Sequence, residues 1–197
     1  VDFSSSASFT QVSVVPQLQK KFGQGWDNTF ILSENGSWGP RLDGQLRPWG
    51  AIVNNTQLLK PFSFVKDNFR DAFDTGAELN NTLSLSGGTE SSTYFLSYGN
   101  INSDGMMPSD NDTYKRNTVS LSGSTKFKGF SASTTINYVG RKSRFVETGQ
   151  GLSGIGANFY EEILQIPVDI PIQEFEDYKN LYFNVDNYFT PFAENPY

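Results

Sequence analysis

The chain has 197 residues, of which 18% are charged and 15% are aromatic, and its net charge at pH 7 is −6. The negative charge excludes a polybasic nucleic-acid-binding protein, and the lack of any run of about 18 apolar residues excludes a helical membrane protein. The high aromatic content argues against intrinsic disorder. Because cysteine and histidine are both absent, a disulfide and a Ser–His–Asp or Cys–His catalytic centre are excluded as well. We therefore expect a β-rich protein that is not an enzyme.

Alternation of apolar and small polar residues is the main secondary-structure signal, and this period of two is typical of β-strands. In the first segment Val1, Phe3 and Phe9 occupy odd positions, while serine and threonine fill most even positions. Four further segments follow the same pattern, near residues 77–86, 94–98, 119–124 and 130–138. We predict five antiparallel strands of about ten residues each, which is the length that crosses a bilayer in a β-barrel.

The polar face of these strands carries Ser, Thr and Asn instead of Lys and Glu. Small hydroxyl and amide side chains indicate a face turned to a crowded, wet interior such as a barrel lumen. The opposite face mixes aliphatic and aromatic residues, as a lipid-facing band does. A soluble β-sandwich or β-solenoid with Ser/Thr-rich strands is the alternative interpretation.

The predicted connections alternate between short and long. Tight hairpins occupy residues 87–91 and 126–129, whereas long loops run over residues 16–76, 100–115 and 142–197. All the long loops then leave one end of the sheet, which is typical of outer-membrane barrels and uncommon in compact soluble domains. Within the loops we expect short helices at residues 64–73 and 159–165, the second ended by Pro167.

Residues 149–154 match the glycine-rich G-x-G-x-x-G pattern, and Asp169 follows at the distance of an acidic ribose ligand. A dinucleotide site also needs a buried parallel strand in a βαβ unit, and the preceding strand alternates with Ser and Thr. We therefore interpret residues 149–154 as a loop and expect no cofactor.

Acidic residues offer two further hypotheses. Asp104, Asp110 and Asp112 could supply oxygen ligands to Ca²⁺, but their spacing misses the EF-hand pattern, and a solvated loop is the preferred interpretation. The pairs Glu161/Glu162 and Glu174/Glu176 could serve a two-carboxylate glycosidase, although nothing in the sequence matches one pair to the other. We expect no catalytic residue and no metal site.

All three tryptophans, Trp26, Trp38 and Trp49, lie in the first long loop, and Arg41 follows the second of them. Exposed aromatic side chains near a lumen mouth can stack on sugars or anchor a protein partner. The alternative is that they pack the long loops together. These four residues are our candidates for contact with substrate or partner.

Several motifs resemble the SusC/RagA-type TonB-linked outer-membrane transporters of Bacteroidota. They are FGQGW at 22–26, ENGSWGPRLDG at 34–44, FDTG at 73–76, LSLSGG at 83–88, YGN at 98–100, YKRNT at 114–118, EILQIP at 162–167 and the run 178–197. They occur in the same order as in that family and cover essentially the whole chain.

The resemblance implies a barrel of about 22 strands in the outer membrane, plugged by an N-terminal domain. It implies TonB-dependent uptake of glycans or peptides beneath a SusD-like lipoprotein lid, in a dimer of such pairs. Since Val1 already lies in a patterned segment and five strands cannot close a barrel, we expect residues 1–197 to be one fragment of the barrel domain without an internal boundary. The TonB box and the plug would precede it. A structural or adhesive β-protein of the cell surface is the alternative function.

Overall fold

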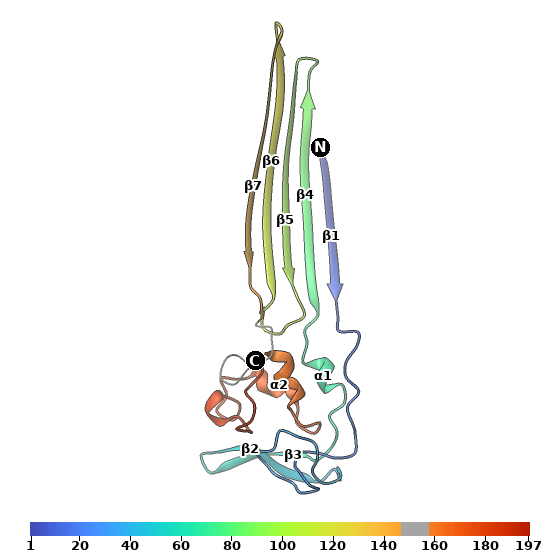
Figure 1. The fold of residues 1–197 in the computed structure, drawn as a ribbon, viewed down its shortest axis with the longest axis vertical. Coiled ribbons are helices and arrows are strands. Elements are labelled where there is room, and N and C mark those ends of the chain that lie inside the picture. Colours follow the sequence, from blue (N-terminus) through green and yellow to red (C-terminus); the bar gives the residue numbers. More distant parts are fainter. Residues whose placement is uncertain (147–157) are drawn as a thin grey trace. The chain divides into compact units, whose positions relative to one another are not determined.

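The computed structural model describes residues 1–146 and 158–197 of the chain (Figure 1). They form two compact units. The sheet unit consists of Val1–Gln11 and Asp74–Phe145. The loop unit consists of Val12–Phe73 and the described residues from Val146 to Tyr197.

The sheet unit contains the five predicted strands, all antiparallel, so the expectation of an all-β antiparallel protein is confirmed. The strands are β1 (Asp2–Thr10), β4 (Gly76–Gly88), β5 (Ser92–Asp104), β6 (Thr113–Phe127) and β7 (Phe130–Ser143). Their order in the sheet is β1-β4-β5-β6-β7. Within the described residues this sheet stays open, with β1 and β7 as its two edges.

The hairpins at one end of the sheet are tight, as predicted. Lys128 and Gly129 join β6 to β7 with φ angles of 45° and 84°, the pair of positive values that a type I′ turn requires. Strands β5 and β6 are longer than the sequence pattern indicated. The predicted loop at residues 100–115 is therefore wrong in its bounds, because ladder pairing extends to Asp104 and Thr113.

The strand register collects most of the apolar residues on one face, as the alternation predicted. Leu96 opposes Leu85 on one side and Leu121 on the other, and directly opposed residues point to the same face. We call this the apolar face. It carries Phe3, Ala7, Phe9, Leu79, Leu83, Leu85, Tyr94, Leu96, Tyr98, Val119, Leu121, Phe127, Phe130, Ile136 and Tyr138.

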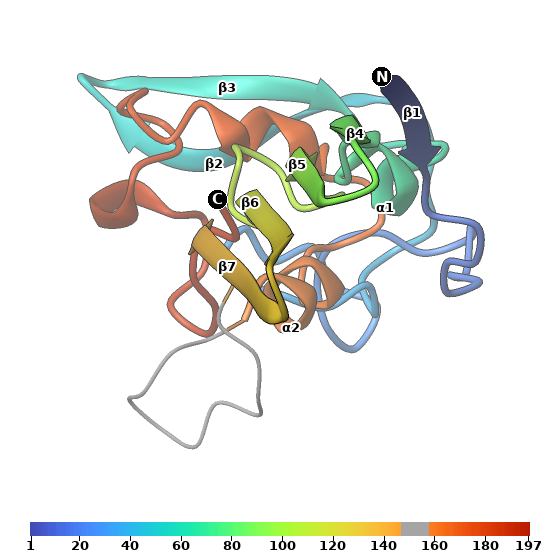
Figure 2. The same cartoon turned by 90° about the horizontal axis from the view of Figure 1, so that it is seen from above.

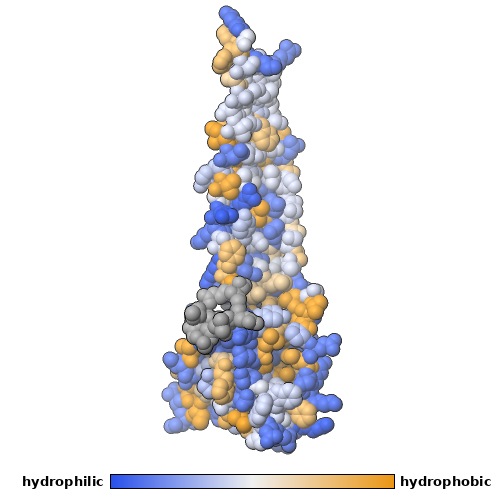
Figure 3. Space-filling view, viewed as in Figure 1, coloured by the Kyte–Doolittle hydropathy of each residue, from blue (hydrophilic) through white to orange (hydrophobic). Residues whose placement is uncertain are grey.

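Nothing in the sheet unit covers the apolar face. Its large side chains are between 36% and 74% exposed. Figure 3 shows apolar side chains spaced at intervals along the visible side of the sheet, among hydrophilic ones. A sheet that buries no apolar face inside its own unit needs another apolar medium or partner to cover it.

The loop unit brings together two stretches that are far apart in the sequence. It contains a β-hairpin of β2 (Leu46–Val53) and β3 (Thr56–Pro61), joined by Asn54 and Asn55 at φ 50° and 60°. The sequence pattern did not predict this hairpin, because Pro48 and Gly50 interrupt the alternation in β2. Figure 2 shows the hairpin from above, next to the C-terminal stretch of the loop unit.

The helices of the loop unit are short. Helix α2 (Phe159–Leu164) agrees with the prediction to within one residue, and the Asn158 side chain caps it by accepting a hydrogen bond from the Glu161 amide. Helix α1 covers only Asn68–Asp71. The longer helix predicted at residues 64–73 is wrong because Asp67 takes a left-handed φ of 55°. Two 3₁₀ turns follow, η1 (Ile172–Glu176) and η2 (Val185–Asn187).

The loop unit has an apolar core that both stretches supply. Trp49 packs edge-on against Phe175, with ring centroids 6.0 Å apart, and also contacts Phe183. The buried members of this core are Trp49, Phe69, Ala72, Ile163, Ile166, Ile170, Ile172, Phe175, Phe183 and Phe189. Among the described helices, none has the length and apolar character that crossing a bilayer would require.

Candidate functional site

Two glycine-rich segments cross in the loop unit, and we call residues 22–29 and 34–41 the tryptophan loops. The Trp38 amide donates to the Gly25 carbonyl at 3.0 Å, and the Asn28 amide donates to the Trp38 carbonyl at 3.0 Å. Gly39 lies so close to the other segment that an added Cβ would sit 2.2 Å from the Gln24 carbonyl oxygen. The glycines are needed because the two backbones touch.

This crossing presents two of the candidate contact residues to solvent. Trp26 is 58% exposed and Trp38 is 66% exposed. Arg41 is also exposed, and its guanidinium lies 5.9 Å from the Phe22 ring centroid. Trp49 differs, since it is only 2% exposed and belongs to the core. The side chains of Trp26, Trp38 and Arg41 are therefore accessible to a partner. Trp49 is instead buried and packs the loops together, which is the alternative interpretation.

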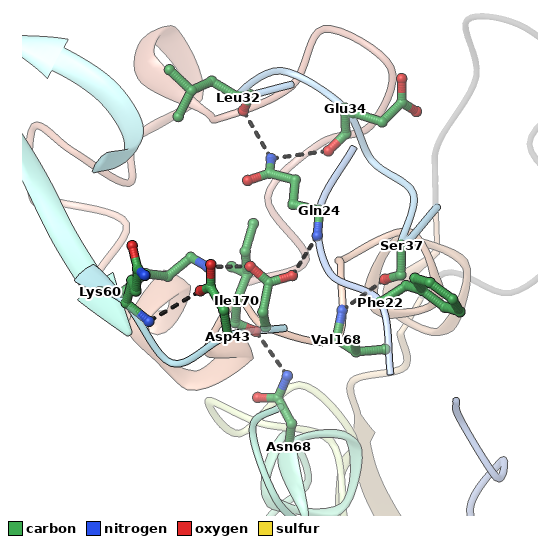
Figure 4. Close-up of polar contacts among 12 residues, drawn as sticks. Phe22, Gln24, Leu32, Glu34, Ser37, Asp43, Lys60, Asn68, Val168 and Ile170 are labelled. Atoms are coloured by element: carbon green, nitrogen blue, oxygen red, sulfur yellow. Dashed lines mark hydrogen bonds and ion pairs between the residues drawn. The ribbon is translucent and has the colours of Figure 1, made fainter. Parts of the chain in front are cut away.

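A buried ion pair lies beneath the tryptophan loops (Figure 4). The Lys60 ammonium on β3 donates to an Asp169 carboxylate oxygen, and both side chains are almost completely buried. The other Asp169 oxygen accepts from the Gln24 amide at 2.7 Å. Burial lowers the pKa of Lys60, and the negative charge of Asp169 opposes that shift. Asp169 thus links the C-terminal stretch of the loop unit to the N-terminal stretch. Its carboxylate is buried and therefore not accessible to a ribose.

The Gln24 side chain fixes the shape of the first tryptophan loop. Its amide nitrogen donates to the carbonyls of Leu32 and Glu34, at 2.8 and 3.0 Å (Figure 4). The second tryptophan loop is tied to the C-terminal stretch, because the Ser37 hydroxyl accepts from the Val168 amide at 2.9 Å. The exposed tryptophans thus stand on a backbone held by buried polar contacts. Sequence reasoning missed Gln24 and Lys60; the signals were a polar residue between two glycines and a lysine in an apolar strand.

Gly39→Ala is expected to destabilise the loop unit, because the new methyl group meets backbone atoms that cannot move independently. We expect a loss of about 1–3 kcal/mol in the free energy of unfolding. Gly36→Ala is the matched control in the same loop, since its Cβ would meet only side chains at 3.4 Å or more. Urea unfolding followed by tryptophan fluorescence measures both, and equal stability of the two variants would contradict the crossing of the loops.

Glu162 on α2 is a buried carboxylate at 4% exposure. One of its oxygens accepts from the Glu194 amide at 2.6 Å. Burial raises its pKa, the hydrogen bond from Glu194 opposes this shift, and the negative charges of Glu194 and Glu161 add to it. Among the described residues the nearby Tyr188 hydroxyl finds no hydrogen-bond partner, and burial raises its pKa too. The Glu162 carboxylate is thus held by the Glu194 backbone inside the loop unit.

Glu162→Gln is expected to remove one component of pH dependence. Because the pKa of Glu162 is raised above its ordinary value of 4.5 in the folded state, ionisation favours unfolding. Its contribution to stability is therefore full below pH 4.5 and falls as pH rises through the folded pKa. The variant keeps an oxygen acceptor for the Glu194 amide, and it should no longer show this decrease in stability with rising pH. Melting temperatures across the acidic range test this, and identical slopes for variant and wild type would contradict it.

The proposed calcium ligands do not form a metal site among the described residues. Asp112 accepts from the Met107 amide through both oxygens, at 3.2 and 3.3 Å. In residues 1–146 and 158–197, no three acidic side chains are grouped to hold a metal ion. The glycine-rich motif at 149–154 lies outside the described residues.

The loop unit also contains an open cavity of about 630 Å³. Most of residues 13–20 line one wall and residues 64–70 line another, with Ile163, Ile166 and Ile172 among its apolar lining. Lys20, Lys66 and Arg70 bring positive charge to the lining. The Arg70 guanidinium is engaged, since it donates to the Val12 carbonyl at 2.5 Å. The cavity has the size and mixed character of a small-molecule site.

The side chains on the apolar face change in character along the strands, toward the loop end of the sheet. The Tyr98 hydroxyl donates to the Asn117 side chain at 2.7 Å. The Tyr138 hydroxyl lies over Gly140, where an added Cβ would meet it at 3.3 Å. Both hydroxyls therefore point toward the loop end of the sheet. The next row is formed by Asn81, Asn100 and Asn117, and beyond it the face becomes polar on β5 to β7, whereas Leu79 and Phe9 keep it apolar on β4 and β1.

Comparison with protein-family models and with curated proteins finds no match to this chain.

Proposed function

We propose that this chain is part of a TonB-dependent outer-membrane transporter of the SusC/RagA type, which takes up glycans or peptides. The observation that carries the proposal is the apolar face. Its side chains, which come from five antiparallel strands, are not covered by any part of the sheet unit. The sequence motifs that resemble that family supply the transport assignment. The apolar medium that covers the face is then the lipid bilayer.

The dimensions of the apolar face support a membrane-spanning role. From Phe130 near the tight turns to Tyr138, a strand rises about 27 Å. At the usual barrel tilt of about 40°, this corresponds to about 21 Å along the membrane normal. On β5 to β7 aromatic residues mark both limits, Phe127 with Phe130 at one and Tyr98 with Tyr138 at the other, as the aromatic girdles of such barrels do.

The open edges of the sheet support a larger barrel. In lipid, the unpaired backbone groups of β1 and β7 would each cost several kcal/mol. Further strands must therefore pair with both edges, and the polar face would then look into the lumen. Its small Ser, Thr and Asn side chains suit a wet interior. We assign the TonB contact to an N-terminal plug rather than to these residues.

The partner assignments follow from the connectivity. The long connections leave the sheet at the end opposite the tight turns, and in outer-membrane barrels that end is extracellular. We assign contact with a SusD-like lid, or with the substrate, to Trp26, Trp38 and Arg41. A net charge of −6 does not favour binding to nucleic acid.

Fractionation of the natural gene product tests the membrane assignment. We expect it in outer membranes, extractable only with detergent, and migrating faster in gel electrophoresis before heating than after. Recovery as a soluble protein without detergent would overturn the proposal. Deleting the gene should abolish growth on an oligomeric nutrient while leaving growth on its monomer unchanged.

A structural or adhesive role at the cell surface is the second candidate, favoured by the exposure of Trp26 and Trp38 on a stable loop unit. The double variant Trp26→Ala/Trp38→Ala separates the two functions. In a transporter we expect it to reduce lid capture or uptake at least tenfold, a typical loss for two aromatic contact residues, with unchanged surface attachment. Loss of attachment with normal uptake would favour adhesion. Unchanged lid capture, uptake and attachment would indicate that both residues serve only to pack the loops.

A further inference from the structure

Two lysines stand directly opposite each other on the apolar face, at its loop end. Lys115 of β6 pairs with Lys142 of β7 in the register. Directly opposed side chains have Cβ atoms about 5 Å apart, and like charges in this arrangement destabilise a sheet. On the other face the neighbouring pair, Arg116 and Arg141, repeats the arrangement. A repulsion of this kind is relieved by an anion between the charges.

Neither lysine has an acidic partner within the described parts of the chain. The ion pairs found there are Arg47–Asp43, Lys60–Asp169 and Lys66–Asp67. Asp104 lies one row nearer the loops on the same face, but it is not a member of these ion pairs. The residue beside Lys115 in its own row is Asn102, whose amide can donate to an anion. The two ammonium groups are therefore available to a ligand.

The position of the lysines along the strand indicates which anion they meet. Tyr138, Gly140 and Lys142 follow one another on this face, so Lys142 lies about 13 Å beyond the tyrosine row along the strand. At the barrel tilt this is about 10 Å along the membrane normal. Tyrosine hydroxyls mark the edge of the hydrocarbon, and the headgroups occupy the next several ångströms. Flexible lysine stems can reach back to that level.

We propose that Lys115 and Lys142 together bind a phosphate group of a lipid headgroup in the outer leaflet. The inference rests on the proposed function, because it places the apolar face against lipid. A lipid is the source rather than free phosphate, since the face is apolar below the row of Asn117 and Gly140. There Val119 opposes Tyr138, and Leu121 opposes Ile136; acyl chains attached to the phosphate would lie against them. Asn102 and Asn117 add amide donors for headgroup oxygens.

The test uses the natural gene product, purified in a neutral detergent and examined by native mass spectrometry. The probe is short-chain phosphatidic acid, compared with phosphatidylcholine of the same chain length and with inorganic phosphate. We expect the wild type to retain phosphatidic acid, and Lys115→Gln/Lys142→Gln to bind it at least tenfold more weakly. Lys126→Gln/Lys128→Gln, which removes the same charge at the opposite end of the sheet, is the control and should bind normally.

Several outcomes would overturn the inference. These are equal binding by the Lys115/Lys142 variant and wild type, equal weakening in the control variant, or inorganic phosphate competing as strongly as the lipid. Lys115→Arg/Lys142→Arg keeps both charges and should keep binding, so a folding defect in the glutamine variant is recognised. A protein recovered without detergent contradicts the proposed function, whereas a detergent-extracted protein that ignores the probe contradicts only this inference.

Discussion

Asp169→Asn is expected to lower the free energy of unfolding of the loop unit by about 3–5 kcal/mol, the usual cost of removing one partner of a buried ion pair. The substitution leaves the Lys60 ammonium in the core without its carboxylate. That ammonium lies 5.5 Å from the Phe62 ring centroid, and a cation–π contact replaces only part of the lost interaction. Urea unfolding followed by the fluorescence of buried Trp49 measures the change.

A second variant separates the ion pair from simple loss of packing. Lys60→Met/Asp169→Asn removes both charges while an asparagine oxygen can still accept from the Gln24 amide. We expect this double variant to be more stable than Asp169→Asn alone, because an unpaired buried charge costs more than a neutral pair. Asp43→Asn, which breaks the exposed pair with Arg47, is the surface control and should change stability little. If Asp169→Asn were as stable as this control, the result would contradict a stabilising ion pair between Asp169 and Lys60.

The sheet unit could be predicted from the sequence because its determinants are local. Period-two alternation assigns a face to each residue within one strand, and the turn residues fix how neighbouring strands align. Lys128 and Gly129 are an example, since their positive φ angles set the β6–β7 register. The cross-strand lysine pair at positions 115 and 142 becomes visible only once that register is known.

The loop unit could not be predicted in the same way, because its contacts join residues that are far apart in the chain. Gln24 and Asp169 are separated by 145 positions, and Ser37 and Val168 by 131. No local pattern records such pairs. The hairpin of β2 and β3 did leave a local signal, the Asn54–Asn55 turn, since asparagine tolerates positive φ. The three tryptophans looked equivalent in sequence, and only tertiary packing separates buried Trp49 from exposed Trp26 and Trp38.

Leu121→Arg is the most direct test of what covers the apolar face. Leu121 lies on that face between Leu96 and Ile136, one row inside the tyrosine row, and it is 42% exposed in the chain alone. If water covered the face, an arginine there would be tolerated, because half-exposed surface positions rarely matter by more than a few tenths of a kcal/mol. Against lipid, an arginine costs about 2–4 kcal/mol at the bilayer midplane and less toward the interfaces, so we expect a cost of about 1–3 kcal/mol at this row.

The matched control is Ser120→Arg, one residue earlier and therefore on the opposite face of the same strand. In a barrel that position looks into the lumen, where a charged side chain stays hydrated. We expect Leu121→Arg to reduce the folded, heat-modifiable protein in outer membranes severalfold, and Ser120→Arg to leave it near the wild-type level. Equal folding of the two variants would contradict the bilayer assignment. The reverse order would place the polar face against lipid, which its serines and threonines make energetically unfavourable.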